Sequence, residues 1–233
     1  MNDIGQAIAQ LKKELSPGTE LVAVSKFRPL GDILTAYAAG QRVFAESRPQ
    51  ELFSKVSGLD SAPGDGAGFG DIEWHFIGHL QTNKLKMVLP YVKMVQSVDS
   101  VRLLDAIDDY GRENGLVTDI LLECRIAGED TKQGFGRGEI LQAISSERLY
   151  DAVRFRGLMG MASFTDDEAV IRREFAEIRD LFLEIKGGAA GVPRERLENF
   201  TELSIGMSGD YRIALEYGST MVRIGTFIFG ERN

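Results

Sequence analysis

The sequence is poor in cysteine, with Cys124 the single example among 233 residues. One cysteine cannot form an intrachain disulfide, and this composition is typical of a protein in a reducing cytoplasm. The chain also lacks an apolar run of about 18 residues, the length needed to cross a bilayer. Its first residues have neither the basic start nor the apolar core of a signal peptide. We therefore expect a cytoplasmic protein without a membrane partner.

Positive charge and metal-binding side chains are also scarce. The formal net charge of -8 argues against nucleic acid as a partner. The two histidines, His75 and His79, have no third ligand nearby, so we expect no metal. The glycine-rich segment 61–70, interpreted as a surface loop, lacks the Lys-Ser/Thr ending of a P-loop. A small anion is not excluded, because arginines and backbone N–H groups outweigh net charge at close range.

Two patterns alternate along most of the chain. Short apolar runs, rich in β-branched and aromatic residues, occupy Leu21–Lys26, Arg42–Ser47, Glu73–Gly78, Met94–Val98, Thr118–Arg125, Arg154–Met161, Glu202–Gly206 and Met221–Phe229. Stretches with helical spacing lie between them, at Leu30–Ala39, Pro49–Val56, Thr82–Tyr91, Val101–Glu113, Gly138–Ser146, Asp166–Lys186 and Gly209–Tyr217. Apolar strands separated by helices predict a parallel α/β sheet covered by helices.

The number of strands predicts the architecture. Eight strands in this rhythm favour a closed (β/α)8 TIM barrel over an open sheet. Such a barrel takes about 250 residues, and no break in composition divides the chain, so residues 1–233 are expected to form one domain. The leading segment Asp3–Leu15 predicts an extra N-terminal helix, which we expect to close the barrel floor.

Functional groups of such barrels lie at the carboxyl ends of the strands. This rule selects Lys26, which follows the apolar run LVAVS. Burial favours the neutral amine of a lysine, the form that reacts with an aldehyde to give a Schiff base. The alternative is a lysine that extends to solvent or pairs with Glu46. The rule also selects His75, which is expected to point into the barrel between Trp74 and Phe76.

Turns rich in Gly, Ser and Thr accompany the last two predicted strands. LSIGMSGDYR predicts a strand, a turn and a helix, and GSTMVRIGT ends in Gly225 and Thr226. Loops after strands seven and eight are the recurrent phosphate site of this barrel, because small residues let backbone N–H groups approach an anion. Ser208 and Thr226 add hydroxyl donors. The alternative is that the glycines only form turns and the hydroxyls cap helices.

Seven segments in sequence order carry a resemblance to a known family. They are LVAVSK, HFIGHLQTNK, QSVDS, TKQGF, RGLMGMA, LSIGMSGD and GSTMVRIGTFIFG. These segments resemble the YggS/PROSC family of pyridoxal phosphate homeostasis proteins, which are related to the N-terminal barrel of alanine racemase. The resemblance implies a barrel that binds pyridoxal 5'-phosphate (PLP), with Lys26 as the Schiff-base lysine and Arg223 facing the pyridine nitrogen. It also implies a phosphate surrounded by Ser204, Met207, Ser208, Gly225 and Thr226.

One segment departs from that family. Relatives usually have F-G-E-N-Y-x-Q-E after the second strand, whereas Phe44–Glu51 reads FAESRPQE. Ser47 therefore replaces an asparagine that touches the cofactor in relatives, and Arg48 replaces a tyrosine. Because a serine hydroxyl keeps one hydrogen bond or recruits a water, we keep Ser47 among the cofactor-binding residues and expect an altered affinity.

The resemblance favours a carrier over an enzyme. PLP works as an electron sink best when its pyridine nitrogen is protonated, and an arginine, which only donates hydrogen bonds, leaves that nitrogen unprotonated. Racemisation also needs a second acid/base, which a separate domain supplies in alanine racemase and which we do not find here. We therefore expect a protein of vitamin B6 homeostasis without catalytic turnover.

Two alternatives stay open. A compact PLP-dependent amino-acid racemase would use His75, Lys132 or a water as the second proton carrier. A barrel enzyme for phosphorylated sugars would form a Schiff base through Lys26 without a cofactor. The expected partners are PLP and, for a carrier, the apo forms of PLP-dependent enzymes. With no long heptad pattern and no dominant apolar stripe, we expect a monomer.

Overall fold

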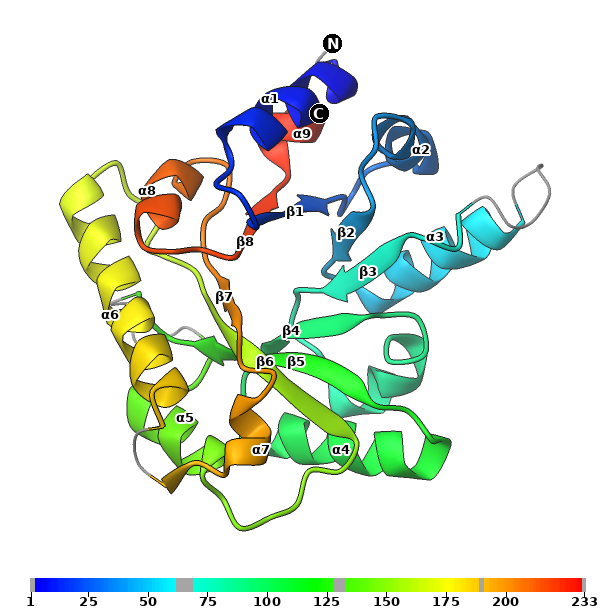
Figure 1. Cartoon of the computed structure of the whole chain (residues 1–233). Helices are drawn as coiled ribbons and strands as arrows, with labels where there is room; N and C mark the ends of the chain where they lie inside the picture. Colours follow the sequence, from blue (N-terminus) through cyan, green and yellow to red (C-terminus); the bar gives the residue numbers. More distant parts are fainter. Residues whose placement is uncertain (1–2, 62–68, 128–132, 189–190, 232–233) are drawn as a thin grey trace.

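Eight parallel strands close into a barrel in the computed structural model, which describes residues 3–61, 69–127, 133–188 and 191–231. The strands are β1 (Glu20–Val24), β2 (Val43–Glu46), β3 (Glu73–Phe76), β4 (Met94–Val98), β5 (Thr118–Cys124), β6 (Val153–Gly160), β7 (Glu202–Ser204) and β8 (Met221–Ile224). Each strand pairs with the next, and β1 pairs with β8 to close the ring (Figure 1). The predicted TIM barrel is confirmed.

Helices surround this barrel on its outer side (Figure 1). Those in the described residues are α1 (Ile4–Glu14), α2 (Leu30–Ala38), α3 (Pro49–Asp60), the 3-10 helix η1 (Thr82–Met87), α4 (Val101–Asn114), α5 (Arg137–Ile144), α6 (Glu168–Lys186), α7 (Arg194–Leu197), α8 (Tyr211–Glu216) and α9 (Thr226–Phe229). Within the described ranges, no helix combines the length and hydropathy that a membrane span requires.

Two local predictions were wrong. The stretch expected as an α-helix over Thr82–Tyr91 is the 3-10 helix η1, whose buried Leu85 and neighbouring Val88 have the three-residue spacing of that helix type. The last apolar run, expected as one strand to Phe229, ends at Ile224 and continues as α9. Periodicity cannot separate a short buried strand from a short buried helix, and α9 buries its apolar residues against α1.

The predicted N-terminal helix is confirmed, but its expected place on the barrel floor is wrong. Its buried face, which includes Ile8 and Leu11, packs against α2 and α9 in the helical layer. The carboxylate of Glu14, at its last residue, accepts a hydrogen bond from the Tyr211 hydroxyl of α8 at 2.5 Å. The apolar face of α1 is therefore buried against neighbouring helices and does not cover the end of the barrel. It occupies the layer beside β1 and β8 (Figure 1).

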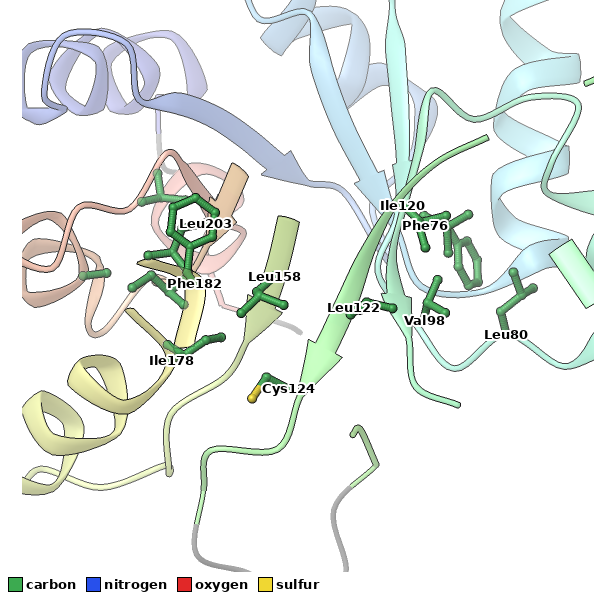
Figure 2. Close-up of a cluster of buried hydrophobic side chains, with 14 of the residues drawn as sticks. Phe76, Leu80, Val98, Ile120, Leu122, Cys124, Leu158, Ile178, Phe182 and Leu203 are labelled. Carbon is green, nitrogen blue, oxygen red and sulfur yellow. The ribbon is translucent and has the colours of Figure 1, made fainter. Parts of the chain in front are cut away.

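Apolar side chains form two clusters separated by the barrel wall. The inner cluster includes Val22 and Val24 of β1, and the outer cluster includes Leu21 and Ala23. This alternation follows from the two-residue period of a strand. Figure 2 shows part of the outer cluster, including Phe76, Val98, Ile120, Leu122, Leu158 and Leu203. Lys26 continues the inward series of Val22 and Val24 beyond the end of β1.

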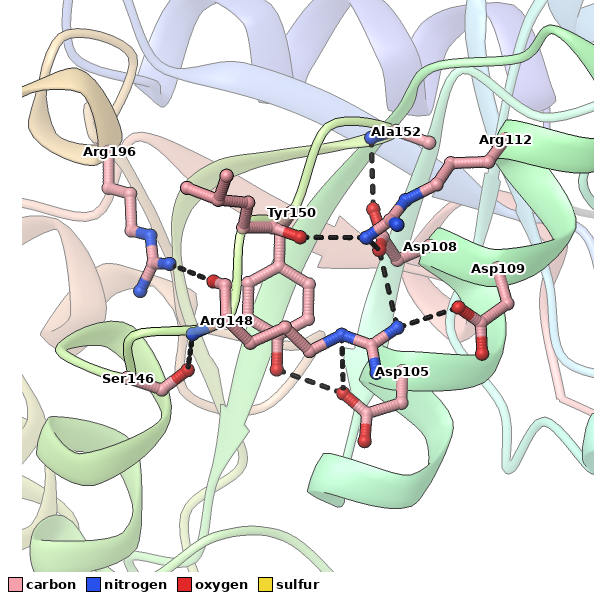
Figure 3. A network of polar contacts seen from close by, with 10 residues as sticks. Asp105, Asp108, Asp109, Arg112, Ser146, Arg148, Tyr150, Ala152 and Arg196 are labelled. Atoms are coloured by element: carbon pink, nitrogen blue, oxygen red, sulfur yellow. Dashed lines mark hydrogen bonds and ion pairs between the residues drawn. The ribbon is translucent and has the colours of Figure 1, made fainter.

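A network of carboxylates and arginines ties α4 to the segment before β6 (Figure 3). The buried Asp108 accepts a hydrogen bond from the Ala152 N–H at 2.9 Å and pairs with Arg112 and Arg148. Arg196 of α7 donates to the Arg148 carbonyl at 2.5 Å. None of these residues lines the cavity that opens at the carboxyl ends of the barrel strands. We infer that this network serves to hold the α5–β6 connection in place.

Candidate functional site

A cavity of about 400 Å³ opens at the carboxyl ends of the strands. Its volume lies in the range of small-molecule sites, about 300–1,000 Å³. Six of the residues predicted from the sequence line it together: Lys26, Met207, Ser208, Arg223, Gly225 and Thr226. The rest of the described wall comes from β1, the residue after β3, β6, the β6–α6 connection, the start of α6 and the turn before α8.

Lys26 enters the cavity wall from a segment whose backbone is held on both sides. The chain turns sharply after it, because Phe27 has φ 63°, a left-handed conformation that is uncommon for residues other than glycine. The Phe27 N–H donates to Glu51 Oε1 at 2.5 Å, and Lys55 Nζ donates to the Ser25 carbonyl at 2.7 Å. The segment thus fixes where the partly buried Lys26 side chain begins.

Arg223 of β8 supplies a buried positive charge to the same cavity, with 3% of its surface exposed. Its Nη1 donates to the Ser204 carbonyl at 2.8 Å and hydroxyl at 2.6 Å, and its Nη2 donates to the Gly160 carbonyl at 2.9 Å. Burial lowers the pKa of Arg223 to about 10, while the carboxylates of Asp210 and Glu123 oppose that effect. The guanidinium therefore stays charged at neutral pH.

A chain of hydrogen bonds runs from Arg223 into the barrel. The Ser204 hydroxyl, which accepts from Arg223, donates to Gln96 Oε1 at 2.8 Å. Gln96 Nε2 lies 2.8 Å from His75 Nδ1. Because a guanidinium only donates, each group in this chain donates a hydrogen bond to the next one, from Arg223 toward His75. His75 therefore accepts at Nδ1. Burial, with a smaller effect of Lys93, lowers the pKa of His75 to about 3, so its ring is neutral and carries its proton on Nε2.

Three predicted site residues do not line the cavity. Ser204 and His75 lie behind Arg223, where they orient its guanidinium through the chain just described. Ser47 is partly buried, and its backbone packs against Gly78, where an added Cβ would lie 2.1 Å from the Ser47 carbonyl oxygen. Lys132, named for the racemase alternative, and most of the glycine-rich segment lie outside the described residues.

The turn after β7 and the start of α9 form a cradle of N–H groups, defined by Ser208, Gly209 and Thr226. In the described part of the chain, no protein hydrogen bond uses the N–H of any of the three. The Ser208 hydroxyl accepts from the Phe227 N–H at 3.4 Å, which joins the two turns. A Cβ added to Gly209 would meet no heavy atom within 4 Å, so the space before the cradle is open. Unpaired N–H groups next to hydroxyls suit a phosphate.

Glu123 of β5, which was not among the residues predicted from the sequence, is 6% exposed inside the barrel. Burial raises its pKa to about 7; Asp99 raises it further, and Arg223 and His79 oppose the shift. Glu123 also lines an adjoining cavity of about 480 Å³. The signal was present, because Glu123 lies near the carboxyl end of an apolar strand, the same position that selected Lys26.

We expect Glu123→Gln to stabilise the protein at pH 8 and to change little at pH 4.5. The folded state holds the Glu123 proton more tightly than the unfolded state, so wild-type stability falls as pH rises from 4.5 to about 7. Above pH 7 the wild type has therefore lost on the order of 3 kcal/mol of its free energy of unfolding. Glutamine does not ionise, so Glu123→Gln avoids this loss. Urea unfolding at both pH values measures the effect.

The matched control for this measurement is Glu113→Gln, at an exposed position near the end of α4. It should leave the free energy of unfolding nearly unchanged at both pH values. A gain from Glu123→Gln of the same size at acidic and alkaline pH would contradict the assignment, because such a gain would not come from ionisation.

Known proteins similar to this chain belong to the family that its sequence resembles. The family model described as alanine racemase, N-terminal domain, matches residues 2–233. The pyridoxal phosphate homeostasis protein of Synechocystis sp. is 34% identical, with 94% of each chain covered. The protein of the same name from Mus musculus is 35% identical, with 99% of this chain and 83% of the mouse protein covered.

Solved structures agree with these sequence matches. PipY of Synechococcus elongatus is 32% identical and covers 97% of this chain, with TM-scores of 0.86 for the structure without PLP and 0.84 for the structure with PLP bound. The match spans 100% of PipY in both cases. Alanine racemase of Corynebacterium glutamicum, 14% identical, has a TM-score of 0.74 over 99% of this chain and 60% of the enzyme, which shows a shared fold.

Proposed function

Because this chain belongs to the alanine racemase N-terminal domain family, and within it to the pyridoxal phosphate homeostasis proteins, we propose that it binds PLP at the barrel mouth. Lys26 holds the cofactor as a Schiff base. The protein acts as a monomeric carrier in the cytoplasm, taking up PLP and delivering it to apo forms of PLP-dependent enzymes. It has no catalytic turnover of its own.

The observation that carries this proposal is the presence of a lysine, a buried arginine and an N–H cradle in one cavity. These groups match PLP in kind. The aldehyde pairs with Lys26, the phosphate with the cradle and its hydroxyls, and the pyridine nitrogen with a donor from Arg223. Bound PLP supplies an electrophilic aldehyde and an electron-withdrawing ring. Ser204, Gln96 and His75 act indirectly, by keeping Arg223 in place.

The side chains of the cavity support binding more than turnover. Arg223 stays charged and gives the ring nitrogen no proton, which weakens the ring as an electron sink. The ionisable side chains in its described wall are Lys26, Asp166, Asp210 and Arg223. Asp210 already accepts the Met207 N–H at 2.5 Å. A racemase needs acid/base groups on both faces of its substrate, so this set favours the carrier.

The proposal is tested by titrating the purified protein with PLP and recording its absorption spectrum. We expect a visible band that saturates near equimolar PLP and that borohydride fixes on the peptide containing Lys26. Pyridoxal, which lacks the phosphate, should bind at least about tenfold more weakly, since a lost charge-assisted set of hydrogen bonds is worth more than 1.4 kcal/mol. A protein that stays colourless with added PLP would contradict the proposal.

Two further measurements separate a carrier from a racemase. Loaded protein, mixed with an apo PLP-dependent enzyme, should restore that enzyme's activity. In D₂O with alanine or serine, it should not exchange the α-proton for deuterium at a rate above that of free PLP. Rapid exchange would favour the compact racemase. Separately, sedimentation of the loaded protein measures its oligomeric state and so tests the proposal that it is a monomer.

A further inference from the structure

A buried group of charges lies directly behind the segment that presents Lys26. Lys55 of α3 is 7% exposed and Glu46 at the end of β2 is 0% exposed. Lys55 Nζ lies 2.6 Å from Glu46 Oε1 and 2.7 Å from Glu51 Oε1. Neither carboxylate nor the ammonium lines the described cavity. We call Glu46, Glu51 and Lys55 the clamp.

The clamp bonds to the residue on each side of Lys26. On one side, Lys55 Nζ donates to the Ser25 carbonyl at 2.7 Å, and the Ser25 hydroxyl donates to the Glu46 carboxylate at 2.6 Å. On the other side, the Phe27 N–H donates to Glu51 at 2.5 Å. The peptide that carries Lys26 is therefore tied to α3 and β2 before and after it.

The bonds hold a conformation that the chain would not adopt unaided. The left-handed conformation of Phe27 costs about 1–2 kcal/mol, and its ring is further held by the Arg48 guanidinium at 4.5 Å. Burial raises the pKa of Glu46, and its Oε2 has no hydrogen-bond partner among the described residues. A buried ion pair is often no more stabilising than apolar side chains of similar volume. Stability alone therefore does not account for charges at this place.

We propose that Lys55, together with Glu46 and Glu51, positions Lys26 for bonding to the aldehyde of PLP and thereby sets the rate at which bound PLP becomes covalently attached. In this step the Lys26 nitrogen forms a double bond to the aldehyde carbon, and the aldehyde oxygen leaves as water with the two amine protons. This inference rests on the proposed function. Bond formation requires the amine within about 3–3.5 Å of the aldehyde carbon and correctly aligned, so a loosened peptide slows it steeply. The phosphate cradle lies in the turn after β7 and at the start of α9, and Arg223 lies on β8, so these groups hold PLP independently of the clamp.

The test compares covalent with non-covalent binding in Lys55→Met, which removes the ammonium at similar length. We expect the rate of appearance of the visible band, and the rate of borohydride trapping, to fall by at least about tenfold. Affinity for pyridoxine 5'-phosphate, which has an alcohol in place of the aldehyde, should stay within about twofold, because its contacts are independent of the clamp. Lys55→Arg, whose guanidinium donates to the same oxygens, should recover much of the rate.

Lys12→Met is the matched control. Its Nζ also donates to a carbonyl, that of Gly40, at 2.7 Å, but it lies on α1 and away from the cavity. Attachment of PLP should proceed at the wild-type rate in this variant. Glu51→Gln, which keeps an acceptor for the Phe27 N–H and weakens the ion pair, gives a second variant if Lys55→Met does not fold.

Each result decides the question. Slow attachment with intact binding of the alcohol analogue supports positioning. Wild-type rates in both Lys55→Met and Glu51→Gln overturn it, as does an equal loss of attachment and analogue binding, which would reflect general stability. If the wild-type protein takes up no PLP, the proposed function itself is refuted. If the wild-type protein binds both PLP and the analogue, a negative result in the variants refutes only the positioning role of the clamp.

Discussion

Lys26→Ala is expected to abolish covalent attachment of PLP and to leave a weaker, reversible complex. The variant loses the amine, while the cradle at Ser208, Gly209 and Thr226 is unchanged. We expect the visible band to disappear and the affinity for PLP to fall about a hundredfold, which corresponds to ~3 kcal/mol. Equilibrium dialysis measures the affinity, and mass spectrometry after borohydride measures the covalent adduct.

Lys86→Ala provides the control, because Lys86 is an exposed lysine of η1. PLP reacts with many accessible lysines at high concentration, and this variant separates such background from the specific site. Its spectrum should match that of the wild type. If Lys26→Ala kept the band at equimolar PLP, the anchor would be another lysine, and the assignment of the cavity would be wrong.

Arg223→Leu is expected to destabilise the protein by about 3–5 kcal/mol. The change leaves the carbonyls of Ser204 and Gly160 without their donor and removes the cation that faces Asp210 and Glu123. For a chain of this size, such a loss lowers Tm by roughly 10 °C. PLP binding should weaken as well, because the proposed donor to the pyridine nitrogen is gone. Denaturant unfolding and a PLP titration measure the two effects.

Arg212→Leu is the comparison for that loss. Arg212 is a surface arginine of α8 that pairs with Glu14 at 2.8 Å, and its side chain is 66% exposed. Exposed ion pairs contribute about 0.2–1 kcal/mol, so this variant should remain close to wild type in stability. Equal effects of the two arginine substitutions would show that the buried position of Arg223 carries no special weight.

The fold could be predicted because strand and helix periods alternate clearly in this sequence. Strands β4 and β5 begin at the predicted Met94 and Thr118, and helix α2 begins at the predicted Leu30. Prediction failed where packing decides between similar patterns. The apolar residues Ile228 and Phe229 suit a strand or a buried helix equally, and contact with α1 makes them helical.

The candidate site was predictable only as far as the ends of strands. Lys26, Ser208 and Thr226 lie just beyond strands or in the turns after them, where the barrel rule looks. Lys55 could not be found in this way, because it lies within α3 and reaches the Ser25 carbonyl only after α3 packs on the barrel. The depth of a side chain inside the barrel was also hidden, which is why Ser204 was expected at the phosphate and lies behind Arg223.

The pairing of β1 with β8 determines when the binding site is complete during synthesis of the chain. Val22 lies opposite Arg223 across this seam, and Lys26 follows β1 while the N–H of Thr226 follows β8. PLP bound as proposed would span the first and last strands, and a ligand that binds only the closed form stabilises it. A nascent chain that has not yet released β8 has no complete site. PLP would then bind only molecules whose barrel has closed, and it would stabilise the pairing of β1 with β8.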